Sequence, residues 1–234
     1  MKYNFVYDTE VLESMSNILS EDEIKIVLAT VIGKHNAIFY GYNPERLIKA
    51  IKRITDTTKF VEQNAFCDVD AGLYKSMGGI MYLKDFDVWK TMEQQFLYGH
   101  TLNAPIRTTQ FIATVSGIPS NNIVPDVLNN FDIVYRCKEY CQTLTSNEKL
   151  LHKLESGIRY KDRLRSGDYT TSTELGIESY WLDCDAYYYV KRTEENNPVY
   201  ARKIALVARS LSDIEHVART ELEQLQEAET FYKE

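Results

Sequence analysis

Four short apolar runs along the first 140 residues limit the folds open to this sequence more than any other feature. Each run is too short for a helix and lacks polar alternation, as is typical of a strand that is buried on both faces. Stretches with helical spacing separate the runs. Buried strands that alternate with helices predict an α/β fold with a parallel sheet flanked by helices. The four expected strands are Ala37–Tyr40, which Gly41 closes, Ile80–Leu83, Gln110–Val115 and Phe131–Tyr135.

Start signals mark the helices around the first expected strand. Residues 21–32 begin with acids and form a helical stretch that ends in a turn. After the strand, Pro44 stands at a first helical position and Glu45 supplies an acid for the first turn. Asn43 is expected to be the N-cap of this helix, because its side chain can accept a hydrogen bond from a free backbone N–H. A further helix is expected over residues 88–96.

The strand signal stops near residue 141, and helical patterns take over. We therefore divide the chain into an α/β core, residues 1–144, and an all-helical subdomain, residues 145–234. In the subdomain, Asn197 and the proline after it are expected to start one helix, and a capping box of Thr220 and Glu223 is expected to start the last one. The expected buried face of the first of these helices consists of Ile204, Ala205, Ala208 and Leu211.

The composition excludes several classes of protein. Hydrophobic residues make up 44% of the 234 residues and charged residues 26%, which is typical of a globular chain. Asp and Glu number 34 against 27 Lys and Arg, so the net charge of −7 disfavours contact of the whole surface with nucleic acid or an anionic membrane. No apolar run approaches the roughly 18 residues that span a bilayer, and no signal peptide is evident. We expect a soluble cytoplasmic protein without a membrane contact.

Residue types that bind metals are scattered along the chain. Cys137 and Cys141 have the spacing of half a zinc site, but no second pair follows them at a usable distance. The four histidines are isolated from one another. Packed thiols are therefore the interpretation of the two cysteines, and no metal site is predicted.

Two features suggest contacts with other macromolecules. Tyrosines number 17, and their amphipathic rings are suited to interfaces, so we expect a protein partner. If residues 187–189, three tyrosines, are extended, at least one ring faces outward. The basic run that contains Lys161, Arg163 and Arg165 is a candidate nucleic-acid contact, although interspersed acids are more typical of a solvated charged face.

Four longer phrases surround the expected strands and the C-terminal helices. They read KHNAIFYG over residues 34–41, GGIMYLKDFD over 78–87, VLNNFDIV over 127–134 and VARSLSDIE over 207–215. In this order, they resemble the AAA+ ATPases of the group that contains the magnesium-chelatase ATPase subunit, the MoxR proteins and the minichromosome-maintenance helicases. The resemblance implies an AAA+-like P-loop NTPase fold in which the C-terminal helices form a lid.

The resemblance also locates the loop that would bind ATP. Active members bind the phosphates with the pattern G-x-x-x-x-G-K-[ST]. In this alignment, Gly41 is the first glycine, but Arg46 takes the place of the second. Leu47 stands at the position of the phosphate-binding lysine, and Ile48 at that of the hydroxyl that binds Mg²⁺. Neither side chain can do this chemistry.

The other nucleotide-binding positions are also altered. The acidic pair that follows the second strand falls on Lys84 and Asp85, and the polar residue after the third strand falls on Ser116. Asn130 replaces an arginine, and the lid arginine has no match, although Arg202 lies about one helical turn away. The resemblance therefore implies a vestigial nucleotide site with no catalytic residue and no cofactor, formed by Gly41, Asn43, Arg46, Leu47, Ile48, Lys84, Asp85, Ser116, Asn130 and Arg202.

Three functions stay open on the sequence alone. The first is a catalytically silent AAA+-like scaffold or regulatory subunit that binds a protein partner, such as an active relative. The second is an unorthodox ATPase that uses ATP and Mg²⁺, which requires a different loop register. The third is a nucleic-acid-associated, helicase-like factor that uses Lys161, Arg163 and Arg165. The first predicts a pocket filled by the chain's own side chains, with Asn43 as a helix cap and Lys84 in place of the metal charge.

Overall fold

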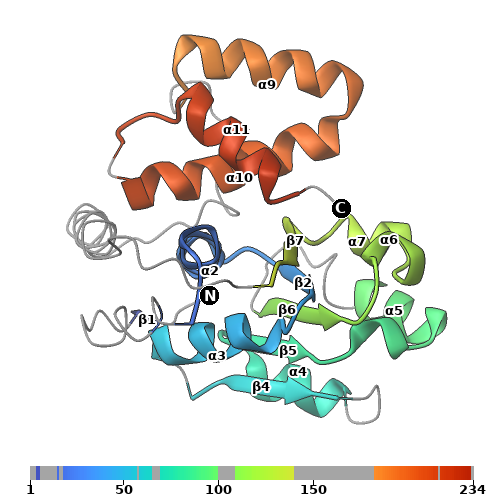
Figure 1. The fold of residues 1–234 in the computed structure, drawn as a ribbon. Coiled ribbons are helices and arrows are strands. Elements are labelled where there is room, and N and C mark those ends of the chain that lie inside the picture. The colour runs from blue at the N-terminus through green and yellow to red at the C-terminus, as the bar shows by residue number, and fades with distance from the viewer. Residues whose placement is uncertain are drawn as a thin grey trace. The chain divides into compact units, whose positions relative to one another are not determined.

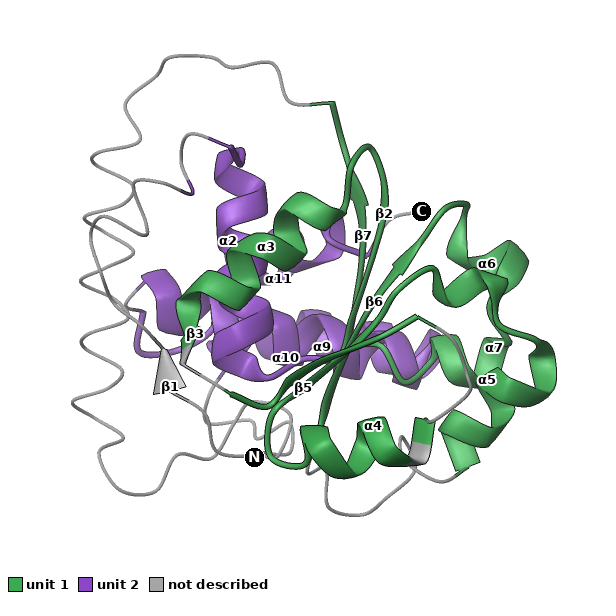
Figure 2. Ribbon diagram, turned by 90° about the horizontal axis from the view of Figure 1, so that it is seen from below, with its two compact units in different colours: residues 1–6, 36–139, 234 green, residues 7–35, 140–233 purple. Residues whose placement is uncertain are grey.

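The computed structural model describes most of the chain, in two compact units (Figures 1 and 2). The first unit comprises residues 1–6, 36–139 and 234, and the second comprises residues 7–35 and 140–233. The expected boundary between residues 144 and 145 lies outside the described residues. The second unit includes the N-terminal helix, which the sequence analysis had placed with the α/β core. The described residues are 4–5, 15, 18–56, 58–64, 69–99, 109–139, 182–215 and 217–232.

The first unit is built on a five-stranded parallel sheet, which confirms the predicted α/β class. Its strands lie in the order β4-β5-β6-β2-β7, so the strand that comes first in sequence, β2, lies between the last two. Ala37 of β2 is in register with Ile112 on one side and Ile133 on the other. The strands are β2 (Ala37–Gly41), β4 (Phe60–Gln63), β5 (Ile80–Leu83), β6 (Gln110–Val115) and β7 (Ile133–Cys137).

The four apolar runs are all strands of this sheet. The second and third have the predicted bounds, whereas β7 begins at Ile133, two residues later than expected. The strand β4 was not predicted, because its four residues are only partly buried and show no continuous apolar run. A separate pair of short antiparallel strands joins β1 (Asn4–Phe5) to β3 (Thr55–Asp56).

Helices cover both faces of the sheet. The crossover from β2 to β4 runs in the opposite direction to that from β4 to β5, so right-handed connections place α3 and α4 on opposite faces, as Figure 2 shows. The expected helix over residues 88–96 is a 3₁₀ turn followed by a helix that starts at Thr91. The helical elements of this unit are α3 (Glu45–Ile54), α4 (Val69–Ser76), η1 (Phe86–Val88), α5 (Thr91–Leu97), α6 (Pro119–Asn122) and α7 (Pro125–Leu128).

Asn36 joins three strands at the amino end of the sheet. Its side chain is fully buried, its Oδ1 accepts a hydrogen bond from the Phe111 N–H at 2.9 Å, and its Nδ2 donates to the Asn130 carbonyl at 3.1 Å. Its own carbonyl accepts from the N–H groups of Asp132 and Ile133. One amide thus aligns the starts of β2, β6 and β7, because every polar group that it buries is paired.

The second unit is a group of four described helices around α10. These helices are α2 (Glu21–Gly33), α9 (Cys184–Asn196), α10 (Pro198–Glu215) and α11 (Leu222–Thr230). The predicted buried face of α10 is confirmed, and Asn197 Oδ1 accepts a hydrogen bond from the Tyr200 N–H as expected of an N-cap. None of the described helices has both the length and the apolar character that a membrane span requires.

Two expectations for this unit need correction. Glu221 and Gln224, one residue further along, form the capping box of α11, because the Thr220 hydroxyl is buried and accepts a hydrogen bond from Ser212 instead. Residues 187–189 lie within helix α9 and are not extended. Tyr188 is nevertheless 71% exposed, so one ring of the three does face outward.

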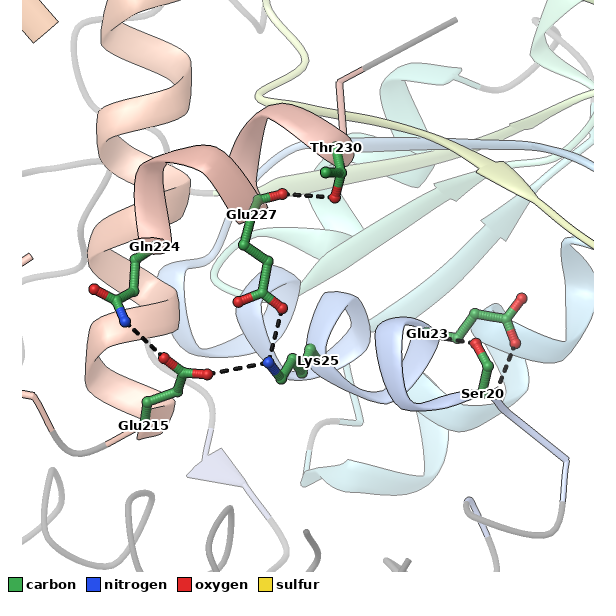
Figure 3. Close-up of polar contacts among 7 residues, drawn as sticks. All are labelled: Ser20, Glu23, Lys25, Glu215, Gln224, Glu227 and Thr230. Carbon is green, nitrogen blue, oxygen red and sulfur yellow. Dashed lines mark hydrogen bonds and ion pairs between the residues drawn. The ribbon is translucent and has the colours of Figure 1, made fainter. Parts of the chain in front are cut away.

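A single lysine links α2 to α10 and α11 (Figure 3). Lys25 Nζ donates to Glu215 Oε1 at 3.0 Å and to Glu227 Oε1 at 2.8 Å, and its side chain is only 14% exposed. Burial lowers the pKa of Lys25, but the hydrogen bonds and charges of the two carboxylates outweigh it and raise the pKa above its ordinary value. Gln224 Nε2 donates to the other oxygen of Glu215 at 2.8 Å.

Replacing Lys25 by Met is expected to lower the free energy of unfolding by about 1–3 kcal/mol, because it leaves two partly buried carboxylates without their cation. Combining it with Glu227→Gln should recover part of the loss in urea denaturation. Lys191→Met is the matched control, since its ion pair with Glu194 is exposed to solvent and contributes little to stability. Equal losses for the two lysines would contradict this account.

Candidate functional site

The turn after β2 is the centre of the site that the sequence analysis identified. Gly41 ends the strand with φ of 90°, and the next residue, Tyr42, donates its N–H to the Cys137 carbonyl of β7 at 2.9 Å. A Cβ atom on Gly41 would lie 2.6 Å from that same carbonyl oxygen. Glycine is therefore required here for two reasons, the left-handed backbone and the close approach of β7.

Asn43 does not cap helix α3, contrary to expectation. Its backbone is left-handed, with φ of 45°, whereas an N-cap residue has extended backbone. Pro44 occupies the N-cap position, and no side chain caps the helix. The Asn43 carbonyl instead accepts a hydrogen bond from the Arg46 N–H at 3.3 Å. The turn thus begins the helix by its backbone alone.

Arg46 places its guanidinium group in this turn. Nη1 donates to the Tyr42 carbonyl at 2.9 Å and Nη2 to the Lys138 carbonyl at 2.6 Å. The group also lies over the Tyr42 ring, 5.7 Å from its centroid, and the side chain is only 8% exposed. A phosphate-binding turn presents N–H groups to an anion, but this turn presents carbonyl oxygens to a cation.

The two residues after Arg46 belong to the core of the first unit. Leu47 is fully buried and Ile48 almost so, on the face of α3 that packs inward. They stand where the sequence alignment requires a phosphate-binding lysine and an Mg²⁺-binding hydroxyl. Their side chains supply neither a charge nor a ligand atom, and they contribute to packing.

A buried tyrosine that the sequence analysis missed connects three elements at the same edge of the sheet. The Tyr82 hydroxyl, on β5, donates to Glu45 Oε1 at 2.5 Å and lies 2.8 Å from Thr114 Oγ1 on β6. Because Tyr82 has one proton and gives it to Glu45, Thr114 is the donor in the second bond. Thr114 in turn accepts from the Asp85 N–H at 3.4 Å. The chain of donors ends at the Glu45 carboxylate.

The Tyr82 hydroxyl is held in its neutral form. Burial raises its pKa well above the ordinary value, and the hydrogen bond to Glu45 raises it further. It therefore remains a hydrogen-bond donor throughout the physiological pH range. In the sequence, Tyr82 reads as one more apolar residue of a buried strand, so only the three-dimensional pairing with Glu45 shows its role.

The pair after β5 takes no part in this network through its side chains. Lys84 is half-buried, and its N–H donates to the Gln63 carbonyl at 3.0 Å. Among the described residues, the Lys84 ammonium has no hydrogen-bond or ion-pair partner, so nothing ties it to the Arg46 turn. Asp85 is exposed and has a left-handed backbone, with φ of 49°. The predicted role of Lys84 in place of a metal charge therefore finds no support in a contact among the described residues.

The remaining predicted residues make other contacts, belong to the second unit or lie outside the described chain. Ser116 is exposed and donates its N–H and hydroxyl to Asp87 Oδ2, at 3.1 and 2.5 Å. Asn130 Nδ2 donates to the Asp126 carbonyl. Arg202 is an exposed residue of α10 in the second unit. Lys161, Arg163 and Arg165 lie outside the described residues, and so does Cys141.

Neither metal ligands nor relatives identify the site further. In the part of the chain that the structure describes, no three His, Cys, Asp or Glu side chains are grouped closely enough to hold a metal ion. No protein-family model matches the sequence, and no curated protein is significantly similar to it. The geometry of the turn and of the Tyr82 network is therefore the basis for a functional proposal.

Replacing Gly41 by Ala is expected to lower the free energy of unfolding by at least about 1 kcal/mol, because the new Cβ meets the Cys137 carbonyl and the backbone is left-handed. Gly99→Ala is the matched control, since a Cβ on Gly99 meets no atom within 4 Å. Thermal or urea unfolding measures both. A neutral Gly41→Ala variant would show that β7 does not approach the turn as described.

Replacing Tyr82 by Phe is expected to cost about 1–3 kcal/mol of unfolding free energy, because the Glu45 carboxylate and Thr114 lose their shared partner. The raised pKa of Tyr82 gives the loss a pH dependence. The contribution is complete below about pH 10, the ordinary tyrosine pKa, and disappears as the pH rises toward the higher folded-state value. Denaturation at several pH values tests this, with the exposed Tyr74→Phe as control.

Proposed function

We propose that this chain is a catalytically silent AAA+-like protein, of the magnesium-chelatase type, that serves as a scaffold or regulatory subunit for a protein partner. The observation that carries the proposal is the Arg46 guanidinium in the turn after β2, where it is bound by the Tyr42 and Lys138 carbonyls. A triphosphate would have to displace this group from both oxygens and from the Tyr42 ring.

The surroundings of Arg46 make it a poor phosphate ligand. Two of its nitrogens already donate hydrogen bonds to backbone oxygens. These oxygens would face an anion that entered the turn. Glu45, the preceding residue, adds a negative charge nearby and accepts a hydrogen bond from the Tyr82 hydroxyl. Leu47 stands at the position of the lysine that would bind the β- and γ-phosphates, and its side chain is buried.

Hydrolysis needs more groups than binding does, and they are also absent from the aligned positions. Mg²⁺ requires a hydroxyl and a carboxylate, but Ile48 and Lys84 stand at those places. Losing one group of such a concerted set usually costs orders of magnitude in rate. This is the reason to propose a non-enzymatic role over the unorthodox ATPase.

The sheet topology supports the relation to AAA+ proteins. Numbered by their order in the sequence, the five parallel strands lie in the order second, third, fourth, first and fifth. This order puts the Gly41 turn at the carboxyl edge next to β6 and β7, where a strand that ends in glycine and leads into a helix would hold a phosphate in the fold that the resemblance implies. Ligand sites of parallel sheets lie at that edge.

A binding role suits the exposed aromatic side chains. Tyr42 is 52% exposed, Tyr74 79% and Tyr188 71%, and such rings serve as anchors in protein interfaces. The alternative nucleic-acid role rests on Lys161, Arg163 and Arg165, and no described residue argues for it over a protein partner.

Titration with ATP and Mg²⁺ in a calorimeter tests the proposal. We expect no saturable heat from the native protein and no phosphate release above the buffer rate. Arg46→Ala is informative because it empties the turn but leaves Leu47 and Ile48, so it should not bind ATP either. Micromolar binding by the native protein, or turnover that Asp85→Asn abolishes, would favour the ATPase alternative.

A further inference from the structure

Strand β4 forms one edge of the five-stranded sheet, beside β5 (Figure 1). The Lys59 carbonyl accepts from the Ile80 N–H, and the Gln63 carbonyl accepts from the Lys84 N–H, both at 3.0 Å. A parallel ladder uses alternate residues of a strand, so the backbone groups of Phe60 and Glu62 point away from β5. Both residues are at least partly exposed, and among the described residues these outward groups have no partner.

Lysines lie on helices α3 and α4, which cover opposite faces of the sheet, and at the residue before β4. On the α3 side, Lys49 and Lys52 are exposed, and Lys52 Nζ lies 5.6 Å from the centroid of the Phe60 ring. On the α4 side, Lys59 Nζ donates to the Met77 carbonyl at 2.8 Å, and Lys75 is exposed in the last turn of the helix. We call Lys49, Lys52, Lys59 and Lys75 the basic edge.

Acidic residues also lie near β4, because Asp56 of β3 stands four residues before Phe60 and Glu62 belongs to the strand itself. Glu62 is exposed on the strand, and its charge acts on Tyr82, whose hydroxyl binds Glu45 at the carboxyl edge of the sheet. The four lysines of the basic edge outnumber Asp56 and Glu62, in a chain whose net charge is −7. A negatively charged ligand would be attracted to the basic edge.

We propose that β4 is a strand-addition site for an acidic, extended segment of a partner protein. The inference rests on the proposed binding function and specifies the chemistry of the partner. The segment's backbone would pair with the outward N–H and C=O groups of Phe60 and Glu62, and its carboxylates would meet the basic edge from both faces. A nucleic acid satisfies the charges but cannot form the ladder, so the open backbone groups favour a polypeptide.

Two structural roles of the same lysines compete with this proposal. Lys52 and Lys75 lie in the last turns of α3 and α4, where a cation stabilises the helix through its dipole. Lysines beside an edge strand also prevent two copies of a chain from pairing through that edge. Either role predicts no affinity for an acidic strand, so binding separates them from the proposal.

The test uses the full chain and a fluorescein-labelled octapeptide, Glu-Glu-Thr-Val-Thr-Val-Glu-Glu, in fluorescence anisotropy. We expect saturable binding that weakens with added salt, and the double variant Lys49→Gln/Lys52→Gln should reduce affinity about three- to tenfold. Lys90→Gln, an exposed lysine elsewhere in the first unit, should leave affinity unchanged. The same peptide with N-methyl groups on alternate residues should not bind, because it keeps the charges but cannot pair with the strand.

Several results would overturn the proposal. These are no binding of the acidic peptide, equal binding of its N-methylated form, or tighter binding of a labelled oligothymidylate, which would make the basic edge a nucleic-acid surface. Self-association of the lysine variants without any peptide binding would assign the lysines to edge protection alone. A parallel ATP titration keeps the two proposals distinct, since ATP binding contradicts the silent site and leaves the peptide result intact.

Discussion

The Arg46 guanidinium donates hydrogen bonds to the Tyr42 and Lys138 carbonyls, and the structure of the carboxyl edge of this sheet depends on them. They hold together the turn after β2 and the segment after β7, which are 92 residues apart at this contact. In a phosphate-binding loop, an anion would satisfy free N–H groups there. In this protein the Arg46 guanidinium donates to carbonyl oxygens, so a side chain of the protein stabilises the turn.

The Tyr82 network similarly joins α3, β5 and β6 by hydrogen bonds between side chains of the protein. A carboxylate at the start of α3, a phenol on β5 and a hydroxyl on β6 satisfy one another in a mostly buried position. An unpaired polar group there would cost about 1–3 kcal/mol, so the network also fixes how α3 packs on the sheet. Together with the Arg46 hydrogen bonds, it stabilises the carboxyl edge of the sheet.

The sequence predicts the sheet well and the site only in part. Apolar runs locate four of the five parallel strands because strands buried on both faces leave a local signal, whereas the partly exposed β4 leaves none. The sequence alone shows that Leu47 and Ile48 cannot bind phosphate or Mg²⁺, since their side chains have no nitrogen or oxygen atoms. Asn43 fails as a predicted cap because the turn demands φ of 45°, and the roles of Arg46 and Tyr82 depend on partners far along the chain.

The amide of Asn36 has a consequence for how the chain acquires this fold. Its partners, Phe111 and Asn130, lie 75 and 94 residues further on, so the central strand gains both neighbours only after more than half of the protein has left the ribosome. Until then β2 is an apolar segment with two unpaired edges. Slow folding follows from the same strand order that places the turn after β2 between β6 and β7.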